Sequence, residues 1–194
     1  MLTFNDERHE YRWLGEVVPS VTQLMQRLQD WGFVPPDVLA AAQERGTDVH
    51  LLTQFHDEGD LAPETIGDKG AYLDAWIDFC ATYKVEWSGI ECQGFSQRFG
   101  FAGTYDRKGK LLLTSERDLW LIDIKTSAVR HRCMGMQLAA YRQIEAEKDS
   151  AWMLARRATV QLKPNGKYDF REWKNPKDWA AFQALISLTN WSTS

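Results

Sequence analysis

The sequence predicts an α/β fold, in which a central mixed β-sheet of four or five strands is flanked by helices and carries β-hairpins at its margins. Three patterns support this fold class. The apolar run at 119–124 is typical of a buried strand. Apolar residues recur at helical spacing on either side of it, at 72–83 and 134–144. Alternating segments with turn residues, at 2–18 and 151–173, predict hairpins.

The bulk composition is that of an ordinary globular protein. The chain has 194 residues, of which 44% are hydrophobic and 26% charged, and we expect residues 1–194 to form a single domain. Its apolar runs are shorter than a membrane span, and residues 1–20 lack the pattern of a signal peptide. We therefore expect a cytoplasmic protein with no membrane partner. Three widely spaced cysteines predict neither a disulfide framework nor a zinc site.

The first half of the chain begins with a hairpin that turns near Leu14-Gly15. Ser20 is the expected N-cap of a short helix, with Gln23 completing a capping box. After a break at Pro35-Pro36, a second helix starts at Asp37, and Gly46 either interrupts it or marks a close approach of another element. The acidic stretch 56–64, which includes Asp57, is predicted to be a solvated loop.

The sheet begins near Val85. Gly103 is expected to let the backbone pass closely by another element, and Asp106 to close a short strand. The polar segment 107–110 is predicted to be a hairpin turn, with a second turn at 115–118 before the buried strand. A basic loop and a helix follow, then a hairpin that turns at 164–167 and a closing helix at 179–188.

Two charged residues interrupt the buried strand, where neither belongs if the strand serves packing alone. At strand period 2, Asp123 and Lys125 point to one side, whereas Ile122 and Ile124 point to the other. Together with Asp106, this face offers two carboxylates and an ammonium group. Such a combination suggests a divalent-metal site with a lysine beside the attacking water.

Four short motifs together resemble the PD-(D/E)XK nuclease superfamily, and in particular its RecB-type branch, which includes many phage-encoded exonucleases. They are GxxxH ending at His50, GxxD ending at Asp106, DxK at 123–125, and QxxxY at 137–141. The resemblance covers roughly residues 16–165 and implies a restriction-endonuclease-like core. It further implies Mg²⁺ or Mn²⁺ as cofactor, held by His50, Asp106, Asp123 and the carbonyl of Ile124. The residues that it implies for catalysis are Asp106, Asp123, Lys125 and Gln137.

The function implied by this resemblance is metal-dependent hydrolysis of DNA, most simply by an exonuclease acting on ends or single strands in phage-type recombination or DNA processing. A recombinase or single-strand-annealing protein would then be a partner, and the host cytoplasm the location of a phage-encoded chain. Two alternatives remain open. One is a non-catalytic DNA-binding or protein-interaction module on the same fold, and the other is a structure-specific or RNA-directed endonuclease. Three cysteines cannot supply the four that hold an iron–sulfur cluster in some relatives, so no cluster is expected.

Some of these residues also have a plain structural interpretation. A lone histidine near a helix, such as His50, is usually a surface or hydrogen-bonded residue, although the motifs downstream favour a ligand. Glu91 is either a further carboxylate near the metal or an exposed strand residue. Gln137 and Tyr141 share one helix face; they either contact DNA and order the site or belong to an ordinary half-exposed face.

The charge is unevenly distributed along the chain. Residues 1–97 hold 17 acidic and 6 basic side chains, whereas residues 98–194 hold 10 acidic and 17 basic ones, for a net charge of −4. A basic half around an acidic metal cluster suits a phosphate backbone, and we expect Arg130, Arg132 and Lys108 to bind DNA from turns beside the motif strands. The alternative is that these charges only solvate the surface.

Overall fold

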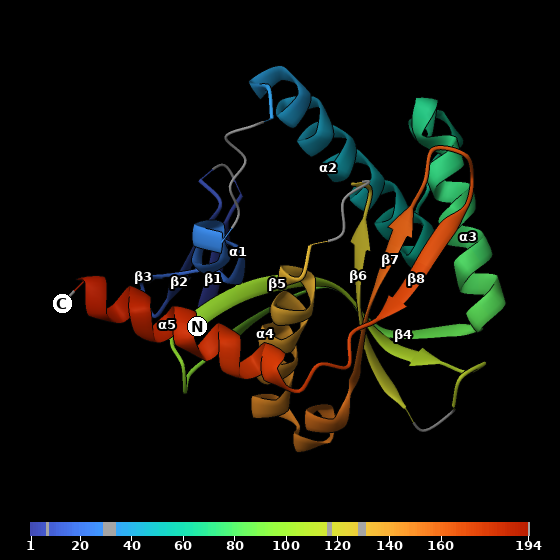
Figure 1. Ribbon diagram of the computed structural model, residues 1–194. Coiled ribbons are helices and arrows are strands. Elements are labelled where there is room, and N and C mark those ends of the chain that lie inside the picture. Colours follow the sequence, from blue (N-terminus) through green and yellow to red (C-terminus); the bar gives the residue numbers. More distant parts are fainter. Residues whose placement is uncertain (7, 29–33, 116–117, 128–130, 194) are drawn as a thin grey trace.

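A computed structural model describes residues 1–6, 8–28, 34–115, 118–127 and 131–193. Its centre is a five-stranded sheet in the order β4-β5-β6-β7-β8, which confirms the α/β class (Figure 1). The strands are β4 (Val85–Ser96), β5 (Phe101–Leu111), β6 (Leu119–Lys125), β7 (Arg156–Leu162) and β8 (Tyr168–Glu172). Because β6 and β7 are parallel and the other neighbours antiparallel, the sheet is mixed.

Helices cover both faces of this sheet (Figure 1). Helices α2 (Pro36–Glu58) and α3 (Gly70–Tyr83) pack on one face, where Trp76, Trp120 and Ile122 are fully buried. On the other face lie α1 (Val21–Met25), α4 (Cys133–Lys148) and α5 (Lys177–Thr193), which bury Leu121 and Leu138. Short 3₁₀ segments occupy Gln26–Leu28, Pro63–Thr65, Gly67–Lys69 and Ser150–Leu154. None of the helices in the described ranges has the length and apolar character needed to span a bilayer.

The N-terminal segment forms a separate three-stranded antiparallel sheet of β1 (Leu2–Asn5), β2 (Glu10–Trp13) and β3 (Glu16–Val18). Leu14 and Gly15 link β2 to β3 with φ angles of 52° and 92°, the left-handed pair that suits a two-residue hairpin turn. Ser20 then caps α1, and its capping box with Gln23 is confirmed. Ser20 also forms a parallel bridge with Ala102, which attaches this segment to the start of β5.

Two predicted segments differ from the structure. Helix α2 continues without a break through Gly46 and ends at Glu58, so that Asp57 lies in a helix and not in a solvated loop. The segment 107–110 is not a turn but the continuation of β5, paired with β4 and β6, so Asp106 lies within this strand and does not close it. Gly109 explains the misleading composition, because a Cβ at this position would lie 2.1 Å from the carbonyl oxygen of Glu86. The glycine serves close approach of two strands and not chain reversal.

Candidate metal centre and active site

The site lies where two neighbouring strands separate. The ladder between β5 and β6 ends at the pair Arg107–Ile122, while β6 remains paired with β7 as far as Lys125. Asp106 is the residue of β5 just beyond the ladder, and its Oδ2 accepts a hydrogen bond from the backbone N–H of Ile124 at 2.5 Å. A side-chain carboxylate thus replaces the missing strand partner, since a buried N–H requires an acceptor. The resulting fork lies at a pocket that residues of both strands help to line.

Three metal-ligating side chains converge in this fork. His50 from α2, Glu91 from β4 and Asp106 from β5 offer ligand atoms that all lie within 4.8 Å of one another. Nε2 of His50 lies 3.0 Å from the carbonyl oxygen of Ile124, to which it donates in the tautomer that carries its hydrogen on Nε2. In that tautomer the lone pair of Nδ1 is directed toward Oδ1 of Asp106, 3.5 Å away. Two facing lone pairs call for a proton or a cation between them.

This donor set fits a divalent cation. Carboxylate oxygens are the ligands that Mg²⁺ and Mn²⁺ prefer, and an imidazole nitrogen moves the preference toward Mn²⁺. The carbonyl oxygen of Ile124, which the resemblance adds to the ligands, lies against His50 at the edge of the same cluster.

The backbone at Glu91 aims its carboxylate at this cluster. Its φ of 45° is a left-handed value that few non-glycine residues adopt in a strand, and it lies between the ladder pairs formed by Ile90 and Cys92. Of the two interpretations of Glu91, the structure favours the first, because its carboxylate belongs to the possible metal site. Burial, and then the neighbouring charge of Asp106, raise the pKa of Glu91 to about 7. A bound cation therefore has to displace a proton from this group near neutral pH.

The second half of the site is an ion pair on β6. Nζ of Lys125 lies 2.8 Å from Oδ2 of Asp123, whose side chain is 2% exposed. Ile122 and Ile124 lie in the core of the opposite face, so the predicted alternation is confirmed. Burial raises the pKa of Asp123 to about 6, against the opposing influence of Lys125. For Lys125, burial favours a lower pKa, but attraction to Asp123 and Asp106 outweighs it and the pKa is raised. Asp123 faces the pocket beside the three-residue cluster, of which it is not a member.

A buried arginine, which sequence reasoning missed, binds Glu91 and the backbone of Asp106 in the candidate metal site. Arg107 is fully buried, and its Nη1 donates to Glu91 at 3.0 Å and to the carbonyl oxygen of Asp106 at 2.8 Å. Its Nε donates to Asp57 at 2.7 Å, and its Nη2 to Thr53 at 3.2 Å. Asp57 is itself 3% exposed, contrary to the predicted solvation. Nothing local in the sequence reveals this pair, because its members are fifty positions apart.

Helix α4 supplies the Gln–Tyr pair. Nε2 of Gln137 donates to the hydroxyl of Tyr141 at 3.0 Å, and both residues line the pocket. Tyr141 is only 2% exposed. Its ring packs on Gly103, where a Cβ would lie 2.7 Å from the ring carbon Cε1, so the close approach predicted for this glycine is confirmed. This burial favours a role in ordering the site over contact with the DNA backbone.

Of the three basic residues predicted to bind DNA, Lys108 and Arg132 lie in the described ranges. Lys108 lies in β5 and not in a turn, and it is engaged by Glu145 at 2.6 Å and by the ring of Trp152. Its ammonium group is therefore engaged within the fold, and the prediction that placed Lys108 in a turn is wrong. Arg132 is exposed at the start of α4. Arg130 lies outside the described residues.

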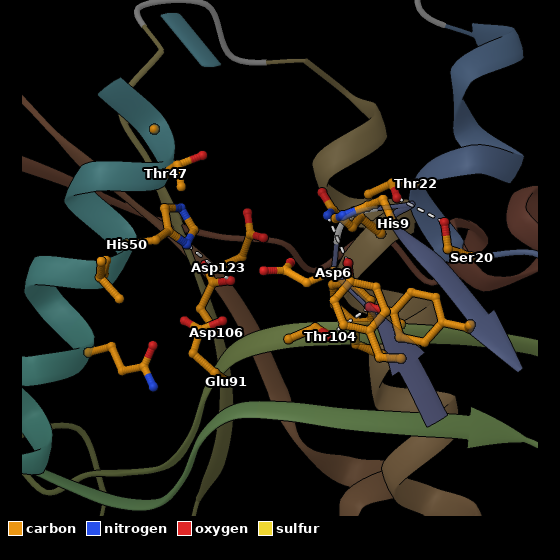
Figure 2. A pocket seen from close by; sticks show the side chains of 18 of the residues that line it. Asp6, His9, Ser20, Thr22, Thr47, His50, Glu91, Thr104, Asp106 and Asp123 are labelled. Atoms are coloured by element: carbon orange, nitrogen blue, oxygen red, sulfur yellow. Dashed lines mark hydrogen bonds and ion pairs between the residues drawn. The ribbon is translucent and has the colours of Figure 1, made fainter. Parts of the chain in front are cut away.

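The pocket itself has a volume of about 580 Å³ and two walls. One wall carries His50, Asp106 and Asp123, and the other comes from the N-terminal sheet and the start of α1, which sequence reasoning did not connect with the site (Figure 2). The aromatic and polar residues of that second wall are Phe4, Asp6, His9, Tyr11, Ser20 and Thr22. In Figure 2, Asp6 and His9 lie across the pocket from the metal-ligating cluster.

Comparison with known proteins finds likeness in structure and not in sequence. No protein-family model matches the chain, and no curated protein matches it. The solved structure of SSO0001 aligns with 75% of this chain and 74% of its own at 17% identity, with a TM-score of 0.41. A candidate exonuclease from Eubacterium rectale aligns with 76% of this chain at 10% identity, with a TM-score of 0.48. The chain spans 65% of that protein, just under two thirds.

Proposed function

We propose that this protein is a metal-dependent nuclease that hydrolyses phosphodiester bonds in DNA. The observation that carries the proposal is the fork between β5 and β6, where the cluster of His50, Glu91 and Asp106 adjoins the ion pair of Asp123 and Lys125 in one open pocket. This arrangement agrees with what the motif resemblance implies for a PD-(D/E)XK nuclease. The proposal rests on the site and on that resemblance.

Each group has a role in this reaction. A divalent cation, when bound, lowers the pKa of water and neutralises charge on the scissile phosphate. His50, Glu91 and Asp106 hold it, and Asp123 adds a further carboxylate at the pocket. Lys125, kept cationic by its carboxylate neighbours, orients water or stabilises the negative charge that develops on phosphorus-bound oxygen.

The charge of the site favours catalysis over simple binding. Asp123 is almost fully buried, and Glu91 has a pKa raised to about 7, so both carboxylates carry an electrostatic cost in the protein alone. A surface that only attracts DNA gains nothing from buried negative charge, because the phosphate backbone is itself anionic. Converging carboxylates are instead suited to a cation that acts on a phosphate.

The test is a time course on end-labelled linear DNA and on covalently closed circular DNA, with Mn²⁺, Mg²⁺ or EDTA. We expect degradation of the linear DNA with either cation, none in EDTA, and survival of the circle, as befits an exonuclease. Asp106→Asn is the matched control, since its amide oxygen still accepts from Ile124 while the charge is lost. Cleavage of the circle would favour the endonuclease alternative. Absence of cation-dependent cleavage on every substrate, or full activity of Asp106→Asn, would overturn the proposal.

A further inference from the structure

The wall of the pocket opposite His50, Glu91 and Asp106 carries aromatic side chains. Phe4 of β1 and His9, which precedes β2, both face the pocket. Their rings meet edge to face, with centroids 5.3 Å apart and planes at 81°. Phe4 also packs on Tyr11, with centroids 4.5 Å apart. Three adjoining rings therefore form one surface on the side of the pocket away from His50.

Tyr11 fixes this surface to the fold, whereas Phe4 and His9 are accessible to solvent. Tyr11 is 3% exposed, and its hydroxyl shares a hydrogen bond of 2.7 Å with Oγ1 of Thr104 in β5. Phe4 is half-buried and His9 is exposed. The turn that carries His9 is held by a hydrogen bond from its N–H to the carbonyl oxygen of Asp6, at 3.2 Å. His9 has a φ of 50°, in the left-handed region, which histidine adopts more often than most residues other than glycine. Its exposed ring lines the open pocket.

The charges divide the pocket into two chemically different parts. A phosphate belongs at the wall where Lys125 and the cation-binding cluster lie. The opposite wall carries Asp6, an exposed carboxylate that would repel a phosphate. The same carboxylate is a good acceptor for the exocyclic amino group of a base, as carboxylates are in base recognition. An aromatic surface beside such an acceptor matches one face and the edge of a nucleobase.

We propose that Phe4 and His9 form a stacking subsite for the nucleobase adjacent to the scissile phosphate, with Asp6 at the edge of that base. This inference rests on the proposed nuclease function and extends it to a class of substrate. A base within a duplex has both faces covered by its neighbours, so a protein ring can stack on it only where the strand is single or its end has frayed. The preferred substrate is accordingly single-stranded DNA or an unpaired end.

The experiment pairs a protein change with a substrate change. Two single-stranded oligonucleotides are compared, one intact and one lacking a single base near its end, with the abasic position moved stepwise along the strand. Affinity is measured by fluorescence anisotropy in Ca²⁺, and KM and kcat in Mn²⁺. We expect the wild-type protein to bind the strand about tenfold or more weakly when one particular base is absent, the usual scale of one base–aromatic stack. Phe4→Leu combined with His9→Ala should remove this discrimination and raise KM for the intact strand, with kcat little changed.

The matched control is Trp13→Leu. Trp13 is an aromatic residue of the same N-terminal sheet, but it stacks on Phe95 at 4.6 Å and does not line the pocket. This variant should keep the discrimination between intact and abasic strands. The subsite is refuted if the wild-type protein treats both strands alike at every position, or if the Phe4 and His9 variant discriminates as well as wild type. A protein that shows the base-dependent affinity in Ca²⁺ but never cleaves would refute the nuclease function and leave the subsite standing.

Discussion

The buried ion pair of Arg107 with Asp57 adjoins the candidate metal-binding residues, and it allows a quantitative test of what stabilises the site. Replacing Arg107 by Met removes a fully buried guanidinium while keeping an unbranched apolar side chain of similar reach. It leaves Asp57, 3% exposed, without its cation, and Glu91 without one donor. Breaking a buried pair by removing one partner costs about 3–5 kcal/mol, because an uncompensated charge stays in a poorly solvated environment. We expect the free energy of unfolding to fall by that amount.

The assay is urea unfolding followed by tryptophan fluorescence, in EDTA at neutral pH. The control is Arg156→Met. Arg156 also pairs with carboxylates, Glu172 at 2.7 Å and Asp118 at 3.0 Å, but its side chain is 32% exposed. Solvent screening limits such pairs to about 1 kcal/mol or less. Equal losses for Arg107→Met and Arg156→Met would show that burial does not set the strength of the first pair, and our account of the support would be wrong.

Three further predictions concern the site itself. Lys125→Ala should lower cleavage by at least ~10²-fold, the scale of one electrostatic stabiliser of a transition state, while circular dichroism stays unchanged; wild-type rates in the purified variant would remove Lys125 from the mechanism. His50→Ala should weaken Mn²⁺ binding in isothermal titration, and excess Mn²⁺ should partly restore activity. His131→Ala is the matched control. An unchanged Mn²⁺ affinity of His50→Ala, or an equal effect of His131→Ala, would make His50 a structural residue. Finally, pKa values of about 7 for Glu91 and about 6 for Asp123 lie above those of the unfolded chain, so these groups stabilise the metal-free protein below about pH 4, and that contribution is lost as pH rises to about 7. The same deprotonation should strengthen Mn²⁺ binding over this range. The test compares thermal unfolding of wild type and Glu91→Gln from pH 4 to 8, with and without Mn²⁺. An identical pH dependence of the two proteins would contradict the raised pKa of Glu91.

The local pattern of the sequence was sufficient for three of the elements that carry motif residues, namely α2, β6 and α4, but not for β5, which Asp106 does not close. Strand period placed Asp123 and Lys125 on one side of β6, and helical spacing placed Gln137 beside Tyr141 on α4; both arrangements are present in the structure. His50 was expected on a helix before the sheet, and α2 provides it. These features depend on the period of a single element, so residues a few positions apart contain the necessary information.

Contacts between residues that are distant in sequence could not be predicted in this way. The segment that begins at Arg107 is polar and contains glycine, which is the composition of a turn, yet it is a buried strand. It can be buried because Asp57, from the end of α2, compensates the guanidinium. The pocket wall formed by Phe4 and His9 was missed for a related reason. The bridge between Ser20 and Ala102 brings the N-terminal sheet to the fork, and no local pattern predicts that bridge.

The charges around the fork fit the divalent cation that we propose for it. Four buried or half-buried carboxylates meet two cations there, namely Asp57, Glu91, Asp106 and Asp123 against Arg107 and Lys125. The excess of two negative charges equals the charge of one divalent ion. In the protein alone, protons reduce that excess, since the pKa of Glu91 rises to about 7 and that of Asp123 to about 6. A cation that replaced these protons would let both carboxylates ionise while Arg107 holds Glu91 in place. The same buried charge that costs stability without metal would thereby become the source of metal affinity.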